Sequence, residues 1–128
     1  MAANTTPIFP GRILQVNYII TDNSDTSTVH SLFSDSENGS RIDSIICYNY
    51  DANNIITIGV FVNDGSTSVM LNKIDLQPDS STDLVKEMKL DQTDGSLFIA
   101  SGQTLEVKLL SAGDGTSHID ICVMGGSY

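Results

Sequence analysis

Apolar and polar residues alternate with a period of two along most of the chain, which is typical of strands that are buried on one face. The alternation is clearest in residues 104–110, where Leu105, Val107 and Leu109 are predicted to point inward. The same pattern predicts strands at residues 12–20, 41–50, 55–62, 67–74, 96–100 and 118–124, with a shorter candidate at 29–33.

A tight hairpin is predicted between residues 55–62 and 67–74. The two runs are separated by Asn63-Asp64-Gly65-Ser66. An Asp-Gly step supplies the positive φ that a short hairpin turn requires. Residues 67–74 are therefore expected to return antiparallel to residues 55–62.

Residues 82–90 fit two kinds of element. Leu84, Val85 and Met88 suit a helical turn as well as a strand, and residues 78–81 (Pro-Asp-Ser-Ser) resemble a helix start. The neighbouring segments all have strand patterns, so a strand is favoured here.

Strict alternation in the candidate central strand, residues 41–50, divides its side chains between two faces. It places Ile42, Ile46, Tyr48 and Tyr50 on one face, which is expected to be the buried one. Both tyrosines would then lie in the core and be unavailable to a ligand.

Seven or eight short strands separated by turn signals predict an all-β fold, an antiparallel two-sheet β-sandwich of jelly-roll or immunoglobulin-like type. An antibody-type domain is disfavoured because no Trp accompanies Cys47 and Cys122. A length of 128 residues suits one domain, expected over residues 11–128. Residues 1–10 contain two prolines and no sustained alternation, so they predict an extended N-terminal arm.

The charge balance argues against two classes of partner. The chain has 16 acidic and 6 basic side chains, for a net charge of −10, and the basic residues are scattered. Binding to nucleic acid or to anionic lipid depends on clustered Lys and Arg. The apolar runs are also too short for a membrane-spanning helix. We therefore expect no nucleic-acid partner and no membrane partner.

The sequence offers little for catalysis or for cofactor binding. Cys122 and His118 share one face of a predicted strand but lie four residues apart, roughly 13 Å along it, which is too far for a hydrogen bond. No phosphate-binding glycine motif and no zinc-ligand spacing occurs. The loops at residues 22–25 and 91–94 offer oxygen ligands for calcium, but they match turn-forming sequences better. We predict a protein that is not an enzyme, with no cofactor and no metal.

Three segments resemble a group of small virion proteins of tailed bacteriophages. They are the opening AANTTPIFP of residues 2–10, the segment NGSRIDSI of residues 38–45, and the terminal GGSY of residues 125–128. Members often begin with a Pro- and Phe-containing arm, enter a central strand through Gly-Ser-Arg-Ile, and end in Gly-Gly-Asp-Tyr. The likeness spans most of the chain, and Ser127 stands where that pattern has Asp.

This resemblance implies a capsid cement or decoration protein on the surface of the virion, made in the reducing host cytoplasm. Its partners would be the major capsid protein and itself, as a homotrimer. The candidate interface residues are Pro7, Ile8, Phe9, Pro10 and Tyr128. The alternative is a receptor- or glycan-binding module of a phage tail, collar or baseplate. Such a module would show clustered exposed aromatic side chains.

Overall fold

The computed structural model describes residues 12–34, 38–80, 85–88 and 97–128, and all regular elements in these ranges are strands. The predicted arm, with Pro7, Ile8, Phe9 and Pro10, lies outside them. None of the described segments is a helix of the length and apolarity that a membrane crossing requires. The strands are β1 (Arg12–Ile20), β2 (His30–Ser34), β3 (Ser40–Asn49), β4 (Ile56–Asn63), β5 (Ser68–Leu76), β6 (Val85–Met88), β7 (Leu97–Ile99), β8 (Thr104–Leu109) and β9 (Ile119–Ser127).

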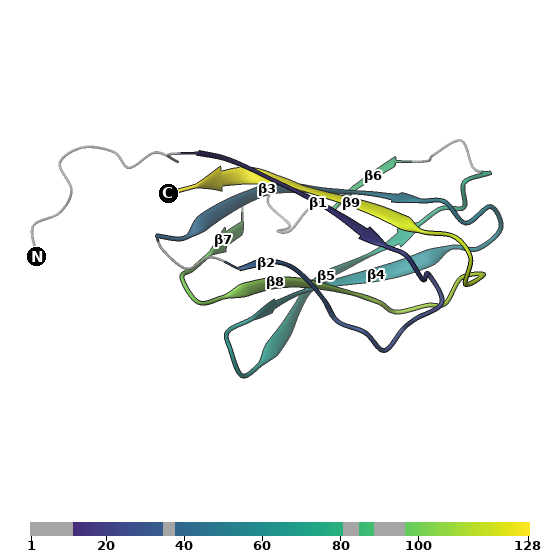
Figure 1. Cartoon of the computed structure of the whole chain (residues 1–128), viewed down its shortest axis with the longest axis horizontal. Helices are drawn as coiled ribbons and strands as arrows, with labels where there is room; N and C mark the ends of the chain where they lie inside the picture. Colours follow the sequence, from purple (N-terminus) through teal and green to yellow (C-terminus); the bar gives the residue numbers. More distant parts are fainter. Residues whose placement is uncertain (1–11, 35–37, 81–84, 89–96) are drawn as a thin grey trace, which may run out of the picture.

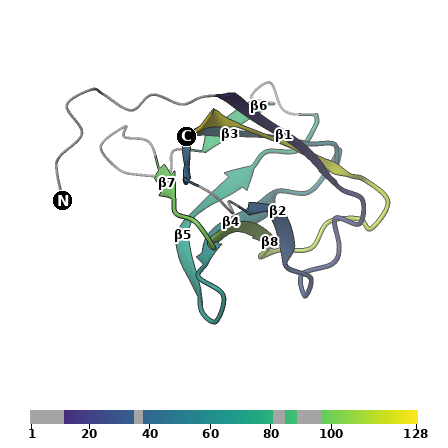
Figure 2. The same ribbon diagram turned by 60° about the vertical axis from the view of Figure 1, so that its left-hand side comes forward.

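The strands form two packed layers, which confirms the predicted antiparallel two-sheet sandwich (Figures 1 and 2). Sheet A has the order β1-β9-β3-β6, and sheet B has the order β2-β8-β4-β5. β6 and β7 pair with successive parts of the same edge of β3, so together they fill one strand position. The nine strand segments thus occupy eight positions, as the alternation predicted.

The order of the strands identifies the sandwich as a jelly roll. β1, β2 and β3 alternate between the two sheets, and the last strand, β9, lies between β1 and β3. In the immunoglobulin fold the first two strands belong to the same sheet. The jelly roll is therefore the correct one of the two predicted arrangements.

Most predicted strands are found with nearly the predicted bounds. The hairpin of β4 and β5 closes through Gly65 at φ 108°, and the Asp64 N–H donates to the carbonyl of Thr67 at 3.1 Å. Residues 85–88 form a strand, as the context favoured. The side chains that alternate inward from β4, β8 and β9 fill the space between the sheets and form the core, among them Ile56, Ile58, Val60, Leu105, Val107, Leu109, Ile119, Ile121 and Val123.

The prediction that Ile42, Ile46, Tyr48 and Tyr50 share one buried face is wrong. A β-bulge between Ile42 and Ser44 shifts the register of β3 against β9. An extra residue in one strand reverses which side chains point inward beyond it. Ile42 is buried, but Ile46 and Tyr48 lie half-buried on the outer side and Tyr50 is 40% exposed.

Candidate interaction surfaces

Tyr128 is a predicted interface residue that the structure does describe. Its backbone N–H donates a 3.1 Å hydrogen bond to the carbonyl of Gly39, and its ring centroid lies 6.1 Å from that of Phe98. Phe98 is 53% exposed, and Ser127 pairs with Arg12 at the start of β1. Tyr128 thus belongs to a partly exposed aromatic pair beside the first described residue.

The outer face of sheet A carries exposed apolar side chains. Ile13 and Ile19 of the edge strand β1 are 91% and 56% exposed, and Met124 of the neighbouring β9 is 36% exposed. Their positions follow from the alternation, because Leu14, Val16 and Tyr18 of β1 take the inner side. Exposed apolar side chains gathered on one face mark candidate interaction sites.

A hollow of about 420 Å³ lies in this face, over β1, β9 and β3. We call it the sheet A hollow. Two rows of cross-strand neighbours line it, and the row nearer the β8–β9 loop carries a carboxylate and a phenol. These rows are Asn17–Cys122–Ile46 and Ile19–Asp120–Tyr48.

Beside the hollow, aromatic rings and carboxylates form what we call the Tyr50 cluster: Tyr48, Tyr50, Asp79, His118 and Asp120. The Tyr50 ring stacks on His118 at 4.1 Å and lies 4.6 Å from the Tyr48 ring. The Tyr50 hydroxyl donates to Asp120 at 2.9 Å, and the Tyr48 hydroxyl donates to Asp79. His118 Nε2 lies 3.6 Å from Asp120.

The backbone brings the members of the Tyr50 cluster together. Tyr48 pairs with Asp120 across β3 and β9, and the N–H of Tyr50 donates to the carbonyl of His118 at 3.2 Å. The hydrogen bond to Asp120, followed by burial, raises the pKa of Tyr50, and the hydrogen bond to Asp79 raises the pKa of Tyr48. Both phenols therefore stay protonated and keep donating at neutral pH. The alternation of the sequence did not predict this cluster, because it places both tyrosines in the core.

A second polar cluster lies at the loop end of the sandwich and is buried. The Asp51 carboxylate, fully shielded from solvent, accepts from Asn23 Nδ2 at 3.0 Å and from the N–H of Asp114 at 2.9 Å. It also accepts from the N–H groups of Asn53 and Asn54 at 2.9 and 3.0 Å. Three loops far apart in the sequence therefore meet on one side chain.

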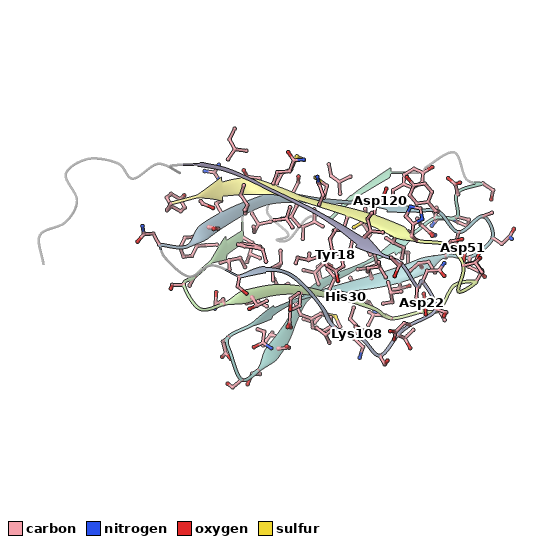
Figure 3. All side chains as sticks on the ribbon, viewed as in Figure 1. Tyr18, Asp22, His30, Asp51, Lys108 and Asp120 are labelled. Carbon is pink, nitrogen blue, oxygen red and sulfur yellow. The ribbon has the colours of Figure 1, made fainter. Side chains whose placement is uncertain are left out.

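Asp51 keeps its charge in spite of its burial. Burial is the largest effect on its pKa and raises it, but the hydrogen bonds from Asn53, Asn54 and Asp114 together lower the pKa to about 2. Asp120, by contrast, lies on sheet A with its side chain 43% exposed (Figure 3). Asp51 is therefore a structural group, and Asp120 is accessible to a partner.

Sheet B also has an apolar outer patch. A hollow of about 390 Å³ lies among Val29, Phe61, Met70 and Leu110. The nearly buried Glu106 borders it and accepts from the hydroxyl of Ser68 at 2.8 Å. Both outer faces of the sandwich thus present apolar surface.

The candidate calcium loop at residues 22–25 is built from internal turns. Asp22 accepts from the N–H and hydroxyl of Ser24 at 3.0 and 2.7 Å, and Asp25 accepts from Ser27 and Thr28. These bonds fit the turn-forming interpretation. Residues 91–94 lie outside the described part of the chain. Within that part, no three His, Cys, Asp or Glu side chains gather as metal ligands would.

The two cysteines lie in different environments. Cys47 is buried, and burial raises the pKa of its thiol to about 12, whereas Cys122 is partly exposed in the sheet A hollow. Both are free thiols. Because Cys47 pairs with Ile121 rather than with Cys122, the two side chains lie on opposite faces of sheet A.

Comparisons with known proteins give likenesses of fold. No protein-family model and no curated protein matches the chain. A chain in the acidic stable capsid structure of Helicobacter pylori bacteriophage KHP30 is 12% identical, with a TM-score of 0.65 over 92% of this chain and 90% of that one. A chain in the cyanophage Pam1 capsid asymmetric unit is 11% identical, with a TM-score of 0.52 over 100% and 93%. This protein therefore shares the fold of chains found in two phage capsid structures.

Proposed function

We propose that this protein is a structural component of a virus particle that binds and stabilises a capsid lattice. The likeness to the KHP30 capsid chain carries the proposal, because it extends over nine-tenths of both chains. The KHP30 chain thus shares this fold over nearly its whole length, without a large additional domain. A likeness of this kind fits a small protein that works as one module of a shell.

Within that role, we infer that the chain acts as a cement or decoration protein on the major capsid protein. Both outer sheet faces carry apolar surface, and Ile13 is 91% exposed on an edge strand. A cement protein works by covering and joining neighbours, so exposed apolar faces support this function better than a catalytic pocket would. No step of this function requires an enzyme activity, a cofactor or a metal.

The predicted arm supplies the second part of the proposal. An extended ten-residue segment spans up to about 33 Å. This is long enough to bring Ile8 and Phe9 onto a neighbouring subunit, where Pro7 and Pro10 would restrict the chain. We propose that these four residues, with Tyr128 at the adjacent end of sheet A, hold a homotrimer together and contact the capsid.

The test uses shells of the same virus that lack this protein. The full chain is expected to co-sediment with the shells and to have a trimer mass by light scattering. Removal of residues 1–10 is expected to abolish both, and the Ile8→Ala/Phe9→Ala variant is the milder control that keeps the chain length. Absence of shell binding by the full chain would contradict the function. Unchanged mass and unchanged binding after truncation would contradict the role of the arm.

A glycan-binding module is the second candidate, because the Tyr50 cluster reaches the surface, with Tyr50 40% exposed. The arrangement of its rings argues against it. The Tyr50 ring already stacks on His118 at 4.1 Å and contacts the tilted Tyr48 ring at 4.6 Å, whereas a sugar stacks on an open aromatic face. Saturable binding of a monosaccharide panel by the isolated chain would favour this second candidate.

A further inference from the structure

We propose that the sheet A hollow and the adjoining Tyr50 cluster bind an arginine or lysine side chain of a partner protein. The inference rests on the proposed function and deepens it, because it names the surface and the chemistry by which the partner is held. Three features support it: the shape of the hollow, the groups on its rim and the charge of the chain.

The floor of the hollow suits the methylene stem of a basic side chain. Ile19, Ile46 and Cys122 line it, and Ile19 is 56% exposed. Long basic side chains lay their methylene groups along apolar surface while the charged head stays near polar groups. A volume of about 420 Å³ accommodates one such side chain.

The rim of the hollow offers acceptors for the charged head. Asp120 lines the hollow, and its side chain is 43% exposed. Tyr50 donates one hydrogen bond to Asp120 Oδ2, and His118 Nε2 lies 3.6 Å from Asp120 Oδ1, so further lone pairs on the carboxylate remain for an incoming N–H donor. Tyr48 lies in the same row, and a guanidinium or ammonium group is attracted to a tyrosine ring.

The net charge of −10 selects the sign of the partner. Six basic side chains cannot neutralise sixteen acidic ones, so the chain attracts a positively charged surface. Electrostatic complementarity of this kind raises association rates and selects among partners. A basic side chain fits both the local rim and the overall charge, whereas a neutral sugar would gain nothing from the net charge.

The experiment is an NMR titration of the full-length chain with N-acetyl-arginine amide. N-acetyl-citrulline amide is the matched ligand, because it has nearly the same shape and no charge. Arginine amide is expected to shift the backbone amides of Ile19, Cys122 and Asp120 saturably, and citrulline amide is expected to bind at least about tenfold more weakly. Equal binding of the two ligands would overturn the inference.

Two variants and one control locate the site. Asp120→Asn is expected to weaken arginine amide binding about fivefold, because it removes the charge at the rim. Ile19→Lys, at a position that is 56% exposed, places a cation in the hollow and is expected to abolish binding. Asp75→Asn makes the same change of charge at an exposed residue of β5 and is expected to leave binding unchanged. Equal effects of Asp120→Asn and Asp75→Asn, or displacement of the arginine ligand by N-acetylglucosamine, would overturn the inference.

Shell binding separates the failure of this inference from that of the proposed function. If the full chain binds shells, and Ile19→Lys and Asp120→Asn bind as well as the unaltered chain, the inference fails and the structural role stands. If arginine amide binds at the hollow but the full chain does not bind shells, the proposed function fails.

Discussion

Asp51 and Asp120 lie toward the same end of the sandwich, yet their surroundings differ in kind (Figure 3). Asp51 is fully buried and accepts hydrogen bonds from three loops, whereas Asp120 is exposed on sheet A beside aromatic rings and a hollow. A carboxylate whose acceptor sites are filled from within holds the fold together. A carboxylate that keeps open acceptor sites on an apolar surface is available to a partner.

The strongest test of this contrast replaces each carboxylate by its amide. Asp51→Asn puts an NH₂ group among the N–H donors of Asn23, Asn53, Asn54 and Asp114, and removes a buried charge that they stabilise. We expect it to lower the free energy of unfolding by about 3 kcal/mol. Asp120→Asn is expected to cost less than about 1 kcal/mol, because its partners are exposed. Urea denaturation of both variants measures the difference, and equal losses would contradict the assignment.

Gly113 tests how closely the loops pack around Asp51. A Cβ atom at this position would lie 2.6 Å from Asp51 Oδ2 and would also meet Asn23 Nδ2. Gly113→Ala is therefore expected to lower the free energy of unfolding by about 2 kcal/mol, because neither partner can move without losing hydrogen bonds. Ala112→Ser, at the exposed neighbouring residue, is the control and should change stability by less than about 0.5 kcal/mol. A thermal shift of Gly113→Ala no larger than that of the control would show that the loops yield easily.

The pH dependence of stability gives a third test of the contrast. The pKa of Asp51 falls from the ordinary aspartate value of 3.8 to about 2 in the folded protein, so its ionisation stabilises the fold at every pH above 3.8. That contribution is lost as the pH falls from 3.8 through about 2. The stability difference between the unaltered chain and Asp51→Asn should therefore shrink over this range, as measured by urea denaturation at a series of pH values. A difference that stays constant down to pH 2 would mean that folding leaves the pKa of Asp51 unchanged.

Most strands, and the inward-facing residues of strands such as β8, could be predicted from the sequence, because alternation is a local property. Leu105, Val107 and Leu109 take the inner face of β8, and Gly65 closes the predicted hairpin. The exposed cluster around Tyr50 could not be predicted. The bulge after Ile42 depends on how β3 pairs with β9, and a shift of one residue moves every later side chain to the other face.

The buried cluster around Asp51 was also beyond local reasoning. Asn23, Asp51 and Gly113 each lie in a loop of polar and small residues, and the sequence contains several similar loops. Only the jelly-roll connections bring these three loops to the same end of the sandwich. There Asp51 accepts hydrogen bonds from the other two loops and from its own. The order of the strands in each sheet also depends on pairing between segments that lie far apart in the sequence.

By itself, the sequence determined that this protein is a small, acidic, antiparallel β-sandwich, because period-two alternation, turn residues and charge are written along the chain. Only the tertiary structure decided which Greek-key order it takes, which aspartate is buried and which tyrosines reach the surface. Those features depend on strand register and on contacts between segments up to about a hundred residues apart, which local pattern does not encode.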